Sequence, residues 1–111
     1  MTAAAISPAQ LATLLEQPSP HALLDVREHG QFGESHLFFA IPLPYSRLEL
    51  HLLSLAPNPN VRVVLCDGGD GVADRAAARA EALGYRNVHV LAGGVAAWER
   101  AGYTLYAGVN V

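Results

Sequence analysis

Short apolar runs recur along this chain, each separated from the next by a helical pattern or by a loop rich in glycine or proline. The runs cover residues 22–26, 37–43, 61–66 and 88–91, and Ile6 closes a shorter one. Such runs are typical of buried strands, and the valine-rich run at 61–66 is the strongest of them. Strands that alternate with helices form right-handed βαβ units. The sequence therefore predicts an α/β fold, with helices on both faces of a mostly parallel sheet of four to five strands.

Signals for helix starts and ends stand between the runs. Ser7 with Gln10, and Ser46 with Glu49, have the spacing of capping boxes, and leucines follow both pairs at helical intervals. A long helical pattern begins after residue 71, and Gly84 is expected to end it. Two helices are therefore expected to start at Ser7 and Ser46.

Composition limits the class of protein. A length of 111 residues fits a single domain, residues 1–111, and an apolar content of 51% is enough to build a core. No apolar run reaches the ~18 residues of a membrane span, and the N-terminus carries no secretory signal, so a cytoplasmic location is expected. The net charge is −3 without a single lysine, which argues against nucleic acid or an anionic membrane as a partner. The alanine-rich, lysine-free composition favours a bacterial source.

Cys66 is the only cysteine, so neither an internal disulfide nor a multi-cysteine zinc site is expected. It ends the run at 61–66, and a loop of glycine and aspartate, residues 67–71, leads into the next helical pattern. Ligands of open α/β sheets bind outside the carboxyl ends of strands, and a helix N-terminus offers unpaired N–H groups there. A thiol beside such groups would have its nucleophilic thiolate stabilised. The residues leave two interpretations open, a reactive thiol and a buried core cysteine.

Three motifs, in this order and at this spacing, resemble those of the rhodanese-homology domain, and the likeness covers nearly the whole chain. They are the LDVRE segment at 24–28, the set Phe32, His36, Ala40, Ile41 and Pro42, and the VLAGG segment at 90–94 with Ala97 and Trp98. The resemblance implies the three-layer rhodanese-like fold. The C-terminal residues 107–111 resemble the boundary after the first domain of bacterial proteins built from several such domains.

The resemblance also implies a sulfurtransferase in which Cys66 is the catalytic nucleophile. Cys66 would take a sulfane sulfur from thiosulfate or another small donor, hold it as a persulfide and pass it to a thiol or cyanide acceptor. Neither a metal nor an organic cofactor is implied, and sister rhodanese domains in a longer chain are the expected macromolecular partners. The substrate-binding residues would be the loop positions and one nearby arginine: Asp67, Gly68, Gly69, Asp70, Gly71, Val72 and Arg75.

The loop departs from the family pattern at two positions. Gly71 and Val72 stand where active members often carry an arginine followed by serine or threonine. Asp67 and Asp70 are expected to raise the pKa of the Cys66 thiol and to repel thiosulfate, and Arg75 would offset this in part. Slow turnover of thiosulfate is therefore expected. The alternative is a catalytically weak or inactive rhodanese module that binds a partner or packs against sister domains.

Other chemistries fit these residues less well. A phosphatase loop would need an arginine where Val72 stands, and a dinucleotide loop would need a glycine where Asp74 stands. The five histidines show no metal-ligand spacing. Asp25 is interpreted as a structural anchor paired with Arg27 or with a loop N–H, and the face that carries Arg75 and Arg79 as a solvated helix surface.

Overall fold

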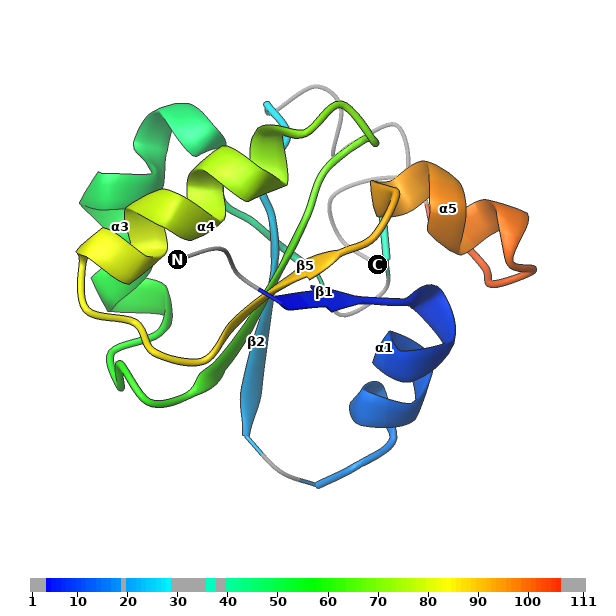
Figure 1. Ribbon diagram of the computed structural model, residues 1–111, viewed down its shortest axis with the longest axis horizontal. Helices are drawn as coiled ribbons and strands as arrows, with labels where there is room; N and C mark the ends of the chain where they lie inside the picture. The colour runs from blue at the N-terminus through cyan, green and yellow to red at the C-terminus, as the bar shows by residue number, and fades with distance from the viewer. Residues whose placement is uncertain (1–3, 19, 29–35, 38–39, 107–111) are drawn as a thin grey trace.

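A computed structural model describes residues 4–18, 20–28, 36–37 and 40–106 of the chain. All five strands run parallel in one sheet, in the order β1-β5-β4-β2-β3 (Figure 1). Their bounds are β1 (Ala4–Ile6), β2 (His21–Asp25), β3 (Ile41–Pro42), β4 (Arg62–Cys66) and β5 (Val88–Leu91). The predicted α/β class and parallel sheet are confirmed. Of the described residues in the apolar run at 37–43, Ile41 and Pro42 form β3, an edge strand where a proline is tolerated.

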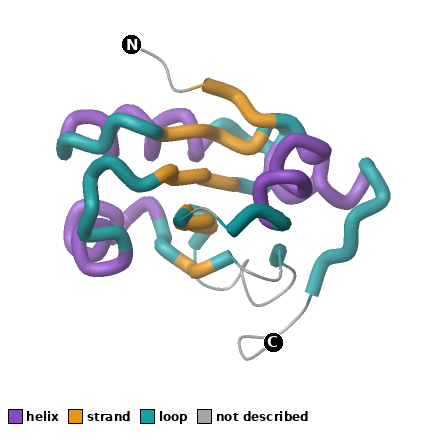
Figure 2. The backbone as a smooth tube through the Cα atoms, turned by 90° about the horizontal axis from the view of Figure 1, so that it is seen from below, coloured by secondary structure: helices purple, strands orange, loops and turns teal. Residues whose placement is uncertain are grey.

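Helices cover both faces of this sheet (Figure 2). Their bounds are α1 (Pro8–Leu15), the 3₁₀ turn η1 (Tyr45–Arg47), α3 (Leu48–Leu55), α4 (Val72–Ala82) and α5 (Gly94–Arg100). Buried residues of α3 and α4 share one apolar cluster with the sheet, and those of α1 and α5 share a second cluster on the opposite face. The three layers match the expected architecture.

Strand β4 lies between β5 and β2, and its side chains alternate between the two clusters. Val63 and Leu65 join the α3/α4 cluster, whereas Val64 and Cys66 join the α1/α5 cluster. This alternation follows from the pleat, which turns successive side chains to opposite faces. The direction of the Cys66 side chain is therefore set by the same pattern that buries the strand.

The two predicted capping boxes have different outcomes. At α1, the Ser7 hydroxyl accepts a hydrogen bond from Gln10 N, and the Gln10 side chain accepts one from Ser7 N, as predicted. The capping box of Ser46 and Glu49 is wrong. Ser46 lies inside η1, and its hydroxyl donates to Glu28 Oε1 at 2.9 Å, so it is not available to cap α3, whose N-cap residue is Arg47.

The end of α4 is as predicted. Gly84 follows the C-cap residue Leu83 with a φ of +104°, a left-handed conformation that favours glycine. The hydroxyl of Tyr85, the next residue, donates to the main-chain oxygens of Leu52 and Ala56 and so ties this turn to the end of α3. Phe32 and the C-terminal residues 107–111, which the sequence analysis named, lie outside the described residues.

Candidate sulfur-transfer site

The carboxyl ends of β2 and β4 meet where the strand order reverses. The chain passes from β2 outward to β3, then crosses back to β4 and continues to β5 on the other side. Ligands of open α/β sheets bind at such a reversal. Asp25 and Cys66 are paired in register at these two strand ends, and Val26 N continues the pairing to Cys66 O at 2.9 Å. The fold thus brings Cys66 to the end of the sheet where a site was expected.

The Cys66 side chain is buried in the core and has an exposed fraction of 0%. It packs with the α1/α5 cluster, which includes Leu91, Val95 and Trp98. Burial raises the pKa of the Cys66 thiol well above its ordinary value, and the Asp25 carboxylate raises it further; Arg27 lowers it, and Asp67 makes a smaller raising contribution. The thiol is therefore protonated at neutral pH, and the nucleophilic thiolate is scarce.

A pH dependence of stability follows from this raised pKa. Below the thiol pKa of the unfolded chain, about 8.5, both states hold the proton and Cys66 has no effect on the pH dependence of stability. Above it the unfolded chain loses the proton before the native state does, so the free energy of unfolding should fall at up to about 1.4 kcal/mol per pH unit. Urea denaturation between pH 7.5 and 9.5 measures this slope, and Cys66→Ala should flatten it. An equally steep slope in Cys66→Ala would assign the loss to other groups.

Asp67, directly after Cys66, is the first residue of the loop. Its side chain is nearly buried, with an exposed fraction of 4%. Oδ1 accepts a hydrogen bond from Gly69 N, and Oδ2 accepts one from Ala73 N in the first turn of α4, both at 2.8 Å. The carboxylate also benefits from the partial positive charge of the helix N-terminus. Gly69 N, one of the loop N–H groups expected to bind the substrate, is thus already bound to the carboxylate of the loop itself.

Of the other predicted residues, Asp70 and Arg75 lie on the surface, whereas Val72 is half-buried and packs against the α3/α4 cluster. Asp70 is exposed, and its Oδ1 accepts a hydrogen bond from Val72 N at 3.3 Å. Arg75 is exposed on the first turn of α4, as expected for a solvated face. Arg79 forms an ion pair with Glu49 of α3, and its guanidinium lies 5.8 Å from the centre of the Tyr45 ring. The roles of Asp67, Gly68, Gly69, Asp70, Gly71, Val72 and Arg75 in substrate binding stay predictions.

Asp25 and Arg27 form a buried ion pair beneath the loop. The shortest contact joins Arg27 Nη2 and Asp25 Oδ2 at 2.7 Å; Arg27 Nε and Arg27 N both donate to Oδ1 at 3.0 Å. The alkyl part of Arg27 passes close to Gly68, since a Cβ at Gly68 would lie 3.6 Å from Arg27 Cδ. The interpretation of Asp25 as an anchor paired with Arg27 is confirmed.

The start of α5 packs directly against the loop. Val95 N donates to Asp67 O at 2.7 Å, and a Cβ at Gly69 would lie 3.1 Å from Gly93 O. A Cβ at Gly94 would in turn lie 2.6 Å from Gly69 N, so this close approach requires a glycine at position 94. A cavity of about 290 Å³ lies between the two turns, and Asp67 and Asp74 are the charged residues among those lining it.

Other predicted features fall outside this region. His36 is buried, and its Nδ1 lies 2.9 Å from Leu37 O, in keeping with a structural histidine. Among the described residues, no three side chains of His, Cys, Asp or Glu gather as metal ligands. No helix in this described part of the chain is long and apolar enough to span a bilayer.

Sequence reasoning missed the position of Asp67. The signal was present, because neighbouring residues of a strand point in opposite directions. Val64 and Cys66 face the α1/α5 cluster, so the side chain of Asp67, the next residue, is expected to point away from that cluster and toward the loop.

Comparisons with known proteins agree with this architecture. The rhodanese-like domain family matches residues 7–101. A thiosulfate sulfurtransferase from Pseudomonas aeruginosa is 39% identical with a TM-score of 0.92, covering 97% of this chain and 21% of its own length. This chain therefore spans about a fifth of that protein. No curated protein matches the sequence significantly.

Two further solved structures share the fold at lower identity. A rhodanese-related protein from Thermoplasma volcanium is 21% identical with a TM-score of 0.80, covering 93% of this chain and 97% of its own. A rhodanese-like domain protein from Staphylococcus aureus is 21% identical with a TM-score of 0.81, covering 96% and 99%. With the matched motifs, the parallel five-stranded sheet and the loop after β4, these findings show that the chain belongs to the rhodanese-like domain family.

Proposed function

We propose that this chain is a rhodanese-like module in which Asp67 suppresses sulfur transfer, and that it serves as a non-catalytic unit beside catalytic sister domains. The observation that carries the proposal is the position of the Asp67 carboxylate. It accepts hydrogen bonds from Gly69 N, one of the loop N–H groups expected to bind the substrate, and from Ala73 N in the first turn of α4. A buried carboxylate held in this way is costly to displace, because it would lose charge-assisted hydrogen bonds.

The surroundings of Cys66 support the same proposal. A nucleophile must reach its substrate, and the Cys66 side chain has no exposed surface. Its raised pKa also keeps the thiol protonated at neutral pH. The charged residues lining the adjacent cavity, Asp67 and Asp74, are acidic and would repel dianionic thiosulfate. Burial, protonation and repulsion all act against a fast reaction.

Persulfide formation on Cys66 is the second candidate. It is favoured by the place of the thiol at the end of β4, where the strand order reverses, and by the 39% identity to a thiosulfate sulfurtransferase. The Cys66 thiolate would attack the outer sulfur of thiosulfate, forming a Cys66 S–S bond and releasing sulfite. Cyanide or a thiol would then take the outer sulfur and regenerate the thiolate. This route requires the α1/α5 cluster to open first.

Intact-mass spectrometry separates the two candidates. We expect the native chain to gain no sulfur from thiosulfate or from a low-molecular-weight persulfide. The double variant Cys66→Ala with Asp67→Cys carries its thiol in the loop cradle, where N–H groups would lower its pKa. We expect this variant to gain one sulfur, which cyanide then removes.

The single variant Cys66→Ala completes the test. It should gain no sulfur, as is expected of the native chain. Sulfur gained by the native chain and lost in Cys66→Ala would support the persulfide carrier and contradict the proposal. Circular dichroism of each variant shows whether it is folded, so a missing sulfur is not confused with a missing fold.

A further inference from the structure

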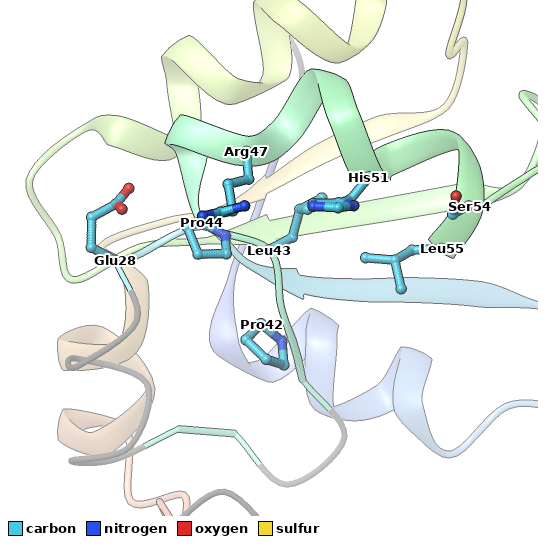
Figure 3. Close-up of a pocket in the computed structure, with 8 residues that line it drawn as sticks. All are labelled: Glu28, Pro42, Leu43, Pro44, Arg47, His51, Ser54 and Leu55. Atoms are coloured by element: carbon cyan, nitrogen blue, oxygen red, sulfur yellow. The ribbon is translucent and has the colours of Figure 1, made fainter.

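The groove between α3 and β3 selects no class of ligand by charge. Its lining includes Glu28 and Arg47, whose charges are opposite, so that neither an anion nor a cation is favoured (Figure 3). The loop after β4 carries a more specific feature. An aspartate directly followed by a glycine occurs in it twice, at positions 67–68 and 70–71.

An aspartate that precedes a glycine can isomerise without an enzyme. The main-chain nitrogen of the glycine attacks the side-chain carboxyl carbon of the aspartate, and the closeness of the two groups makes this reaction intramolecular. The absence of a Cβ leaves the glycine nitrogen accessible and its main chain free to turn. The N–H proton and the carboxyl hydroxyl leave as water, and a five-membered cyclic imide forms. Water then opens this ring at either carbonyl carbon, which restores aspartate or yields isoaspartate, whose main chain runs through the former side chain.

The first of the two pairs is held in place by the fold. The Asp67 carboxylate is nearly buried, and both of its oxygens accept hydrogen bonds at 2.8 Å, from Gly69 N and Ala73 N. It would have to give up both charge-assisted bonds before it could react. The following residue, Gly68, lies against Arg27, since a Cβ at Gly68 would be 3.6 Å from Arg27 Cδ. The fold therefore protects this pair.

The second pair is exposed and loosely held. The Asp70 side chain lies on the surface, and its one hydrogen bond, from Val72 N to Oδ1, is long at 3.3 Å. Because this contact joins residues two positions apart, it folds the carboxyl group back over the main chain at Gly71. A Cβ at Gly71 would meet no atom within 4 Å, and residues 67–71 belong to neither a strand nor a helix. Asp70 and Gly71 can thus approach each other without displacing packed atoms.

We infer that Asp70 is a site of spontaneous isoaspartate formation and that the fold protects Asp67, three residues earlier, from the same reaction. The product lengthens the main chain by one carbon atom directly before Gly71, the N-cap residue of α4. It would therefore alter the geometry of the loop that carries Asp67. This inference depends on the surroundings of the two carboxyl groups and not on whether Cys66 transfers sulfur.

Incubation of the folded chain for several weeks at 37 °C and pH 6 tests the inference. Trypsin cleaves after Arg62 and Arg75, so a single peptide, residues 63–75, contains both pairs. Isomerisation leaves the mass unchanged, but electron-transfer fragmentation distinguishes isoaspartate from aspartate at each position. The yield at Asp70 should exceed that at Asp67 at least about tenfold, because two charge-assisted hydrogen bonds must open at Asp67 first.

The same chain unfolded in urea is the control for the effect of the fold. Both pairs should then give similar yields, because nothing holds the Asp67 carboxylate. Equal yields at the two positions of the folded chain would overturn the inference. The absence of isoaspartate at Asp70 in the folded chain would do the same, and circular dichroism of the incubated sample shows that it is still folded.

A matched variant provides an independent readout. Asp70→Glu keeps the negative charge on the surface, but its cyclic imide would need a six-membered ring, which forms far more slowly. An isoaspartyl carboxyl methyltransferase with labelled S-adenosylmethionine should label the aged native chain and leave aged Asp70→Glu at background. Undiminished labelling of Asp70→Glu would place the modification at another residue and contradict the inference.

Discussion

Replacing Arg27 with methionine should lower the free energy of unfolding by about 3–5 kcal/mol, because it leaves the Asp25 carboxylate buried without its ion partner. The native pair is well formed, with Nη2 and Oδ2 2.7 Å apart and the two side chains 9% and 0% exposed. Methionine keeps the apolar bulk of the side chain, so most of the loss should come from the charge. Urea denaturation at pH 7 measures the effect.

The pair of Arg79 and Glu49 provides a matched control. It has the same chemistry, but both side chains are about half exposed. Ion pairs in such positions contribute only about 0–1 kcal/mol, because water already solvates the separated charges. Arg79→Met should therefore cost less than about 1 kcal/mol. If the two variants lost equal stability, burial would not be the reason for the strength of the Asp25–Arg27 pair.

Gly94→Ala should be comparably damaging, at about 2–5 kcal/mol. A Cβ at this position would lie 2.6 Å from Gly69 N and against the main-chain oxygen of Asp67, so main-chain atoms of the loop would have to move. The φ of +66° adds strain for any residue with a side chain. Thermal unfolding followed by circular dichroism measures the loss. The hydrogen bond from Val95 N to Asp67 O should break at the same time, with faster amide exchange at Val95.

Gly84→Ala isolates the strain from the steric clash. Gly84 also has a positive φ, +104°, but a Cβ there would meet no atom within 4 Å. This substitution should cost about 1–2 kcal/mol, the strain alone. If Gly84→Ala proved as damaging as Gly94→Ala, close packing of α5 on the loop would not be the cause.

The features predicted correctly are those that local sequence determines. The capping box of Ser7 and Gln10 forms within a span of three residues, and Gly84 ends α4 because its own φ allows it. The capping box at Ser46 failed because a residue 18 positions away, Glu28, takes the hydroxyl. The spacing of Ser46 and Glu49 carries no information about that distant contact.

In the candidate site, too, the features set by local sequence were predictable and those set by distant contacts were not. The apolar run at 61–66 predicts that Cys66 stands at a strand end. The pairing of Asp25 with Arg27 was also predictable, because the two residues are only two positions apart. The sequence does not show which carboxylate raises the pKa of the Cys66 thiol most. We expected Asp67 and Asp70, but Asp25 has the larger effect because strand pairing sets it beside Cys66 across 41 positions of sequence. Asp70 instead accepts a hydrogen bond from Val72 N.

The pairing of β1 with β5 joins two segments that lie far apart in the sequence. Ala4 is in register with His89, so the first strand finds its neighbour in the sheet only about 85 residues later. At ~5–20 residues per second, a ribosome needs roughly 4–17 s to make that stretch. During that time Ala4–Ile6 has no strand to pair with. Once β4 has been made, the edge of it that β5 will cover is open to other chains until β5 follows. This domain is therefore most exposed to misassembly just before β5 emerges, and a chaperone that covers Ala4–Ile6 and the open edge of β4 would protect it best in that interval.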